Sequence, residues 1–239
     1  MAKMATDKST SSTGKGNSPK GEKARAKLRA AALLVLEDVG YHRMRISDVT
    51  GQADVAQGLF YHYYSDLKSL TTEVLEDFVS HSLRVEDIEK DVPRGDWYAR
   101  ILAHNTLIVK AYAQRPGIMR CLLQLADSDA DFSQRLRRNF IQQLGWLSRQ
   151  MPRLFPAAQM SEQQAMMVAY TLAGTGETIL RDYYINRDEV LNREQLSVDE
   201  MAELISVMFY RGLFLESPPA EKLHYTTNLQ QMKKTRIAR

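Results

Sequence analysis

The residues best suited to chemistry lie close together in one short stretch of the 239-residue chain, at positions 56–62. A helix over this stretch places Gln57 and Tyr61 in one outward row, and Gly58 and His62 in the next. A glutamine side chain can make two hydrogen bonds to one adenine, and a glycine lets a helix backbone come close to its target. The stretch therefore has the flat, polar and aromatic front that suits a helix for the major groove of DNA.

The surrounding residues predict two short helices and a tight turn that would hold this front in place. The helices are expected over residues 46–52 and 56–63, with Phe60 pointing inward from the second. Asp54 lies where the chain must reverse, and aspartate tolerates a left-handed backbone. Ala56 begins the second helix without a capping side chain, which costs about 1 kcal/mol relative to serine.

This arrangement resembles the helix-turn-helix of the tetracycline-repressor (TetR) family of transcription regulators. The segment V-T-G-Q-A-D-V-A-Q-G-L-F-Y-H-Y-Y, followed by Leu70, is similar to the family pattern I-A-x-x-A-G-V-S-x-G-x-L-Y-x-Y-F, which is also followed by a leucine. The similarity extends over residues 28–78. The chain departs from the family pattern at Asp54, Ala56, Leu59 and Leu67.

The resemblance implies a set of residues that contact double-stranded DNA. Gln57 would read a base edge and Leu59 would pack on a thymine methyl group, while Tyr61 and His62 resemble the family's phosphate-contacting pair. The full predicted set is Arg45, Ser47, Ala56, Gln57, Gly58, Leu59, Tyr61, His62 and Lys68. A helical hairpin with no role in DNA binding is the alternative, but it does not explain Gly58 and Tyr61 on the exposed face.

Charge is unevenly distributed along the chain, although the net charge is only +3. Residues 1–29 carry +6, residues 30–80 carry −5, residues 81–218 carry −2 and residues 219–239 carry +4. Because the predicted helix-turn-helix is not basic, much of the attraction to phosphates would come from the N-terminal tail. Residues 1–19 have almost no apolar content and are predicted to be disordered, either as a basic arm on DNA or as a solvated leader.

Motifs for catalysis or metal binding are absent from the sequence. The five histidines form no H-x-x-x-H or H-E-x-x-H pair, and there is no G-x-S-x-G motif. The single cysteine, Cys121, excludes an intrachain disulfide and suits a reducing cytoplasm. We therefore expect no enzyme, no cofactor, no metal and no membrane span. A helical-bundle enzyme or metal-binding protein without specific DNA binding is the alternative, and a nonspecific helical interaction protein is a third possibility.

Apolar residues recur at helical spacing along the whole chain, which predicts an all-α protein of about nine helices. Residues 20–80 would form an N-terminal three-helix helix-turn-helix domain with a fourth helix as linker. Residues 81–218 would form a C-terminal helical ligand-binding and dimerisation domain, and residues 219–239 a mobile basic tail. Beyond the linker, helices are expected over residues 97–114, 118–125, 132–151, 161–185 and 197–215, with loops at 127–131 and 152–156.

The last two predicted helices carry more apolar surface than one core can cover. Residues 166–180 are apolar on nearly every side, and residues 201–215 are apolar over more than one stripe. Such a surplus predicts a subunit interface. The two helices also occupy the place of those through which TetR-family proteins form homodimers. The alternative is that both helices are simply core of one monomer.

The resemblance also implies a small-molecule effector, bound among the middle helices of the second domain. The lining, mostly Leu, Met and aromatic, indicates a hydrophobic or amphipathic compound. A polar group on an apolar face needs a partner, so four polar candidates stand out: His104, Asn105, Glu177 and Arg181. Glu177 and Arg181 can simply pair with each other. The candidate ligand-binding residues are Trp97, Ile101, His104, Asn105, Ile108, Tyr112, Met119, Leu122, Leu123, Phe140, Leu144, Tyr170, Gly174, Glu177, Thr178 and Arg181.

Together these observations predict a cytoplasmic, ligand-responsive DNA-binding regulator. By the resemblance it would act as a repressor that binds a palindromic operator as a homodimer. Binding of the effector would then move the two reading helices out of the spacing of about 34–36 Å that successive major grooves require.

Overall fold

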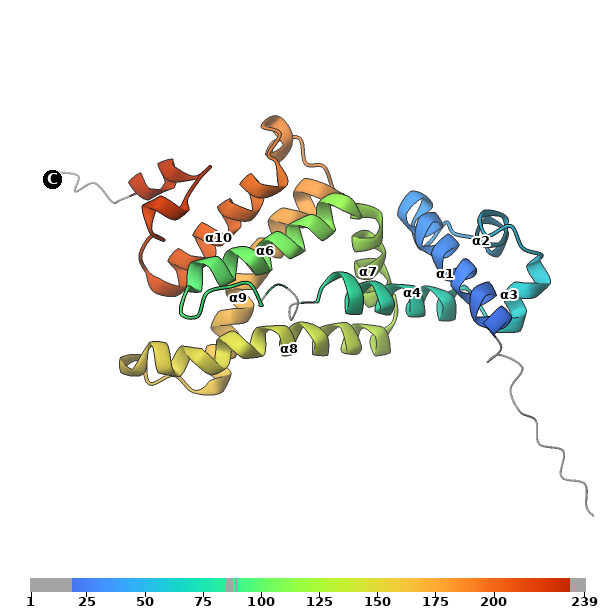
Figure 1. The fold of residues 1–239 in the computed structure, drawn as a ribbon, viewed down its shortest axis with the longest axis horizontal. Coiled ribbons are helices and arrows are strands. Elements are labelled where there is room, and N and C mark those ends of the chain that lie inside the picture. The colour runs from blue at the N-terminus through green and yellow to red at the C-terminus, as the bar shows by residue number, and fades with distance from the viewer. Residues whose placement is uncertain (1–18, 85–87, 89, 233–239) are drawn as a thin grey trace, which may run out of the picture.

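The computed structural model describes residues 19–84, 88 and 90–232, and the regular elements in these ranges are helical. Figure 1 shows a small domain at one end of the molecule, drawn in blue and cyan, and a larger helical bundle that fills the other end. The prediction of an all-α chain with nine α-helices is confirmed for the described residues. Most of the predicted basic tail, residues 1–18, lies outside them, as do residues 233–239.

The small domain consists of α1 (Pro19–Val39), α2 (Ile46–Gln52) and α3 (Gln57–Tyr63), closed by α4 (Leu67–Ser82). Each helix turns one apolar face inward, and the side chains that meet there have no exposed surface. These buried side chains are Leu28, Leu36, Val49, Phe60, Leu70 and Leu75. The bounds of α2 and α3 agree with the prediction to within one residue, and this packing leaves the opposite face of α3 free.

Short-range signals fix the turns of the small domain. Gly40 follows α1 with a φ of 81°, and Asp54 has a φ of 52° between α2 and α3, so both adopt the left-handed backbone. Asp66 caps α4, because its Oδ1 accepts a hydrogen bond of 2.7 Å from the backbone N–H of Ser69. These three predictions from the sequence are confirmed.

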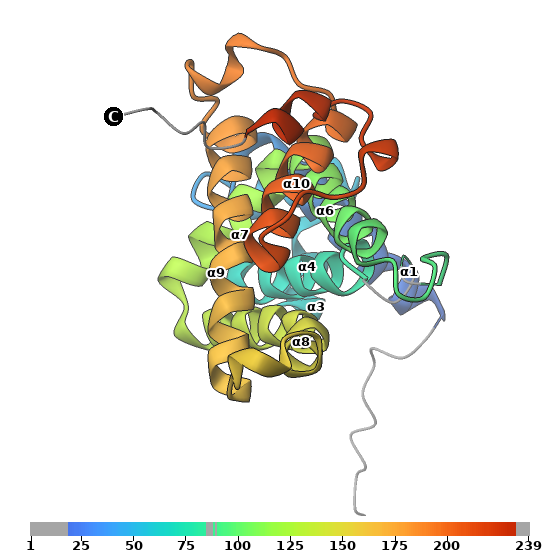
Figure 2. The ribbon, with the colours of Figure 1, turned by 90° about the vertical axis from the view of Figure 1, so that its left-hand side faces the viewer.

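Five α-helices make up most of the larger domain: α6 (Trp97–Gln114), α7 (Pro116–Ser128), α8 (Ala130–Leu154), α9 (Glu162–Leu180) and α10 (Val198–Phe214). The turn Arg181–Ile185 continues α9 as a π-helix. Helix α10 packs along α6, and α9 packs along α8. Figure 2 shows α9 standing upright along one side of this domain.

Capping side chains begin three of these helices as the sequence predicts. Asp96 accepts a hydrogen bond from the backbone N–H of Ala99 at the start of α6. Ser161 and Ser197 begin α9 and α10, and each forms a reciprocal capping box with the residue three positions on. These local signals predict where a helix starts more reliably than where it ends.

The predicted bounds of α7 and α8 are wrong. Helix α7 begins at Pro116, because a proline at the first helical position loses no hydrogen bond, and it runs on to Ser128. Residues 127–131 are therefore not a loop, and Asp129 alone separates α7 from α8 as the cap of α8. Helix α8 also includes Pro152, since burial of the neighbouring Met151 holds the last turn in place.

The predicted mobile tail after α10 is also wrong for the residues that the structure describes. Helix α10 ends at Phe214, and the segment that follows folds back on the helix, with Leu223 and Thr226 buried. Glu203 of α10 anchors it: the carboxylate accepts hydrogen bonds of 2.6–2.8 Å from the backbone N–H groups of residues 224–226 and from the Thr226 hydroxyl. Burial opposes ionisation, but these bonds outweigh it and hold the pKa of Glu203 below its ordinary value.

Within the described part of the chain, no helix has the length and apolar content needed to cross a lipid bilayer.

Candidate nucleic-acid interface and candidate ligand cavity

The front of α3 presents the residues that the sequence selects for contact with DNA. Gln57, Gly58 and His62 are exposed, and Tyr61 is 59% exposed. A Cβ atom added to Gly58 would meet nothing within 4 Å, so this position is open to an approaching surface. Leu59 is only half-buried. The front is thus uncharged, polar and aromatic, as a helix that reads base edges requires.

The back of α3 is held rigidly against the small domain. Phe60 is completely buried and Tyr64 is 5% exposed, with their rings 5.8 Å apart. Tyr64 also accepts a hydrogen bond of 3.4 Å from Arg25 of α1. Because the helix is only seven residues long, these contacts rather than its own hydrogen bonds keep its front in a fixed orientation.

Two arginines of α1 are engaged inside the protein. Arg25 donates to Glu73 at 2.6 Å, and Arg29 pairs with both Glu73 and Asp77 of α4. Both arginines belong to the basic segment 1–29 that the charge distribution selects as the source of attraction to phosphates. The charge that this segment can offer to a partner is therefore smaller than its +6 suggests.

The remaining predicted DNA contacts lie at the edges of the interface. Arg45 and Ser47 are exposed at the start of α2, beside the exposed Ala56 that precedes α3. Lys68 is placed differently: its Nζ lies 2.7 Å from an Asp129 carboxylate oxygen, at the cap of α8. This hydrogen-bonded pair lowers the pKa of Asp129 and raises that of Lys68. Lys68 thus joins the two domains, a role that the sequence does not indicate.

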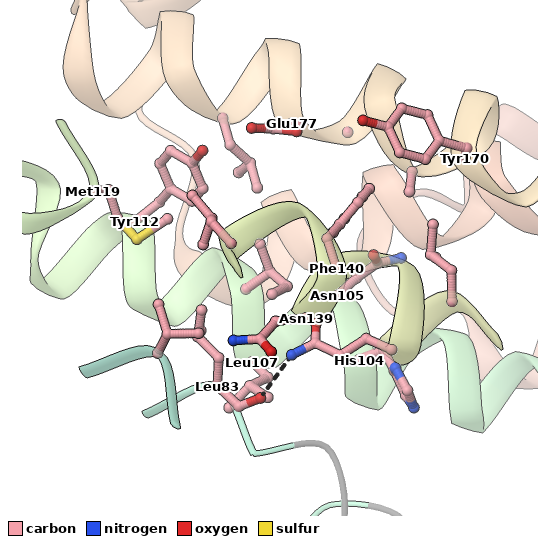
Figure 3. A pocket seen from close by; sticks show the side chains of 18 of the residues that line it. Leu83, His104, Asn105, Leu107, Tyr112, Met119, Asn139, Phe140, Tyr170 and Glu177 are labelled. Atoms are coloured by element: carbon pink, nitrogen blue, oxygen red, sulfur yellow. Dashed lines mark hydrogen bonds between the residues drawn. The ribbon is translucent and has the colours of Figure 1, made fainter. Parts of the chain in front are cut away.

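A cavity of about 380 Å³ lies in the larger domain, between α6, α7, α8, α9 and α10. Figure 3 shows its side chains converging from these helices. The structure brings twelve of the candidate ligand-binding residues together around this cavity: Ile101, His104, Asn105, Ile108, Tyr112, Met119, Leu122, Leu123, Phe140, Leu144, Tyr170 and Glu177. The lining is mainly aliphatic and aromatic, as in most sites for small organic molecules.

Four candidates do not line this cavity: Trp97, Gly174, Thr178 and Arg181. Trp97 lies behind the wall, stacked on Trp146 at 5.8 Å with the ring planes 13° apart. Thr178 is exposed and donates to the carbonyl of Gly174 at 3.1 Å. Arg181 does not form the predicted pair with Glu177; its Nε lies 3.8 Å from Asp182 Oδ1 instead.

The cavity also has lining residues that the sequence reasoning does not select. Val79 and Leu83 come from the end of α4, and Leu107, Asn139 and Trp146 come from α6 and α8. The helical spacing of Leu107 and Trp146 marks them as inward-facing, but it does not show which inward residues border a void. The α4 residues bring the linker helix itself to the edge of the cavity.

Comparison with known proteins identifies the type of the small domain. Residues 28–74 match the family model described as bacterial regulatory proteins, tetR family. This segment of the chain is thus a helix-turn-helix of the TetR family. Over 57 residues it is 35% identical to the uncharacterized HTH-type transcriptional regulator YvdT of Bacillus subtilis (strain 168), a match that covers 24% of this chain and 29% of that protein. The chain therefore matches less than a third of that curated relative's length.

Solved structures extend the similarity of fold to the larger domain of this chain. A TetR-like transcriptional regulator from Rhodococcus sp. RHA1 matches with a TM-score of 0.58 and 16% identity, over 80% of this chain and 96% of that one. A TetR-family transcriptional regulator from Bordetella parapertussis 12822 matches with a TM-score of 0.60 and 18% identity, over 83% and 100%. The larger domain therefore shares its helical fold with these solved regulators.

The small domain packs against α7 through α1. The Glu37 carboxylate of α1 accepts hydrogen bonds of 3.0 Å and 2.9 Å from the backbone N–H groups of Gly117 and Ile118, at the start of α7. The first N–H groups of a helix have no hydrogen-bond partner within that helix, and the helix dipole favours a negative charge at this end. A Cβ added to Gly117 would lie 2.1 Å from the backbone oxygen of Glu37, so the two helices touch. The other side of α7 carries the cavity residues Met119 and Leu122.

Proposed function

We propose that this TetR-family protein is a ligand-responsive transcriptional repressor, which binds a palindromic DNA operator as a homodimer in the cytoplasm and releases it when a hydrophobic or amphipathic molecule enters the cavity. The observation that carries the proposal is the pairing of two features in one chain. A reading helix presents an exposed front, and an apolar cavity lies behind the helices that support it.

The front of α3 gives the proposal its DNA partner. Gln57 hydrogen-bonds to an adenine edge, and Gly58 lets the helix approach the bases. Tyr61 and His62 donate to phosphates and set the register of the helix in the groove. Arg45 and Ser47 add phosphate contacts at the start of α2.

A second copy of the chain is supported by the outer faces of α9 and α10. Met167 is 63% exposed, Val168 is 36% exposed and Met208 is 49% exposed. Large apolar side chains gathered on neighbouring helices mark a protein interface. A homodimer formed through these helices buries them and sets two copies of α3 at a fixed spacing, which matches two half-sites of an operator.

The response to a ligand is supported by the position of α7. This helix borders the cavity with Met119 and Leu122, and it holds α1 through Glu37. Val79 and Leu83 give α4 an edge on the same cavity. A ligand that pushes α7 and the end of α4 apart therefore tilts the small domain, and the spacing of the two reading helices changes.

Selection of bound DNA from a random pool, combined with light scattering of the purified protein, tests the proposal. We expect enrichment of a palindrome with two half-sites, a mass of two chains in solution, and one dimer on each operator. A monomeric protein, or one that enriches no sequence at low ionic strength, would contradict the proposal. A screen of small molecules for release of the selected DNA then tests the response to ligands.

A further inference from the structure

Several polar groups that line the cavity already have partners within the protein. Asn105 donates to the Ser206 hydroxyl at 3.0 Å. Gln143 donates to the backbone carbonyl of Leu83 at 3.4 Å, the dashed line in Figure 3. Arg137, which is the basic residue in the described lining, donates to Ser133 on its own helix at 3.1 Å. Each of these groups is thus held in place by a contact within the protein.

Glu177 differs from these groups. It is the acidic residue in the described lining of the cavity, and it makes no hydrogen bond or ion pair with any described residue. Arg181, one turn further along α9, pairs with Asp182 and lies outside the cavity. The exposed carboxylate of Glu177 therefore stands free at the edge of a largely apolar space.

Aromatic rings flank this carboxylate. Tyr170 is seven residues before Glu177 on α9, so both lie on one face of the helix, and Figure 3 shows Tyr112 and Tyr170 on either side of Glu177. The ring of Phe140 meets Tyr170 edge to face at 5.2 Å. Burial raises the pKa of Tyr112, and the negative charge of the nearby Glu177 raises it further. A carboxylate next to aromatic rings attracts organic cations, because both the charge and the ring faces are negative.

We propose that the cavity binds an amphipathic organic cation, whose apolar body lies among the aliphatic side chains and whose positive group lies at Glu177 between Tyr112 and Tyr170. This inference rests on the proposed function, since it names the chemical class of the effector. A volume of about 380 Å³ accommodates one small organic molecule. An anionic group at the same place is repelled by the charge of Glu177.

Three probes with the same eight-carbon chain test the charge preference: octyltrimethylammonium, 1-octanol and octanoate. Trp146 lines the cavity, so its fluorescence reports occupancy by each probe without any DNA. We expect octyltrimethylammonium to bind at least tenfold more tightly than octanoate. Equal affinities for the cation and the anion would overturn the proposal.

The isosteric substitution Glu177→Gln tests the role of the carboxylate. We expect about tenfold weaker binding of octyltrimethylammonium and unchanged binding of 1-octanol. Folding should be unaffected, because Glu177 is exposed and has no hydrogen bond to lose. Glu162→Gln is the matched control, since Glu162 is exposed on the first turn of the same helix and outside the cavity; its cation affinity should equal that of the native protein.

An unchanged cation affinity in Glu177→Gln would reject the ligand class. Selection of DNA from a random pool, performed on the same preparation, separates this result from a failure of the proposed function. Sequence-selective DNA binding without a preference for the cation rejects only the ligand class. Preferential binding of the cation by a protein that selects no DNA sequence supports the ligand class and rejects the regulator.

Discussion

The small domain and the larger domain use their apolar residues in opposite ways. The small domain packs its central apolar side chains into a buried core and leaves a polar front on α3, although Leu34 stays 47% exposed. The larger domain keeps surplus apolar surface in two places, around an internal cavity and on the outside of α9 and α10. A tight core suits a surface that must keep one shape for its partner, whereas a cavity lets packing change when it is filled.

The first test of this contrast truncates one phenylalanine in each domain. Phe60→Ala removes a completely buried ring behind α3, and we expect a loss of about 3–5 kcal/mol in the free energy of unfolding. Phe140→Ala removes a half-buried ring that already borders a void, so its cost should be clearly smaller. Chemical denaturation of both variants measures the difference. Similar losses would mean that the two regions are equally well packed.

The second test concerns the contact between the two domains. Gly117→Ala adds a Cβ that would lie 2.1 Å from the backbone oxygen of Glu37, so α1 and α7 must separate. We expect a loss of about 1–3 kcal/mol in stability and faster amide exchange at the end of α1. The control is Gly51→Ala in α2, where the added Cβ meets nothing within 4 Å. Because alanine favours the helix more than glycine does, this variant should be more stable than the native protein by up to about 1 kcal/mol. A neutral Gly117→Ala would contradict the close contact.

The third test divides the front of α3 into specificity and affinity. Gln57→Ala should lose about 1–3 kcal/mol of discrimination at one base pair of the operator. Tyr61→Phe removes only a hydroxyl from a phosphate-contacting residue, so it should weaken binding to all sequences about equally. Titrations over operators with single base changes measure both effects. A uniform loss for Gln57→Ala would show that Gln57 does not read a base.

The smallest expected effect is that of Lys68→Ala. Lys68 is predicted from the sequence to contact a phosphate, but its Nζ is paired with Asp129. If Lys68 exchanges Asp129 for a phosphate on binding, Lys68→Ala removes one phosphate contact. The slope of log affinity against log salt concentration should then be shallower by about one in the variant. An unchanged slope would assign Lys68 to the contact between the domains alone. Lys27→Ala, on the exposed side of α1, is the control, because it removes the same positive charge from a residue that is not a predicted DNA contact.

The parts of the fold that the sequence predicts depend on neighbours in the chain. Asp54, Asp66 and Ser161 adopt their expected turn and caps, because those roles need only a few adjacent residues. The start of α8 is different. Three aspartates at 127, 129 and 131 are all suitable caps, and only packing of α7 against α8 selects Asp129.

The candidate site follows the same division. The front of α3 comes from one segment, so its exposed residues can be read from helical spacing. The cavity comes from several helices, and small differences in their rotation decide that Tyr170 and Glu177 line it while Gly174 and Thr178 do not. The ion pair between Lys68 and Asp129 forms between residues 61 positions apart, so no local sequence pattern predicts it.

The anchoring of residues 224–226 on Glu203 has a consequence for synthesis of the protein. The carboxylate is 2% exposed and belongs to α10, but its hydrogen-bond donors leave the ribosome about twenty residues later. A chain that ends between these points would lose both these hydrogen bonds and the packing of the buried Leu223, so it would be less stable. Incomplete translation products would therefore unfold more often than the complete protein, and cellular proteases would degrade them more readily.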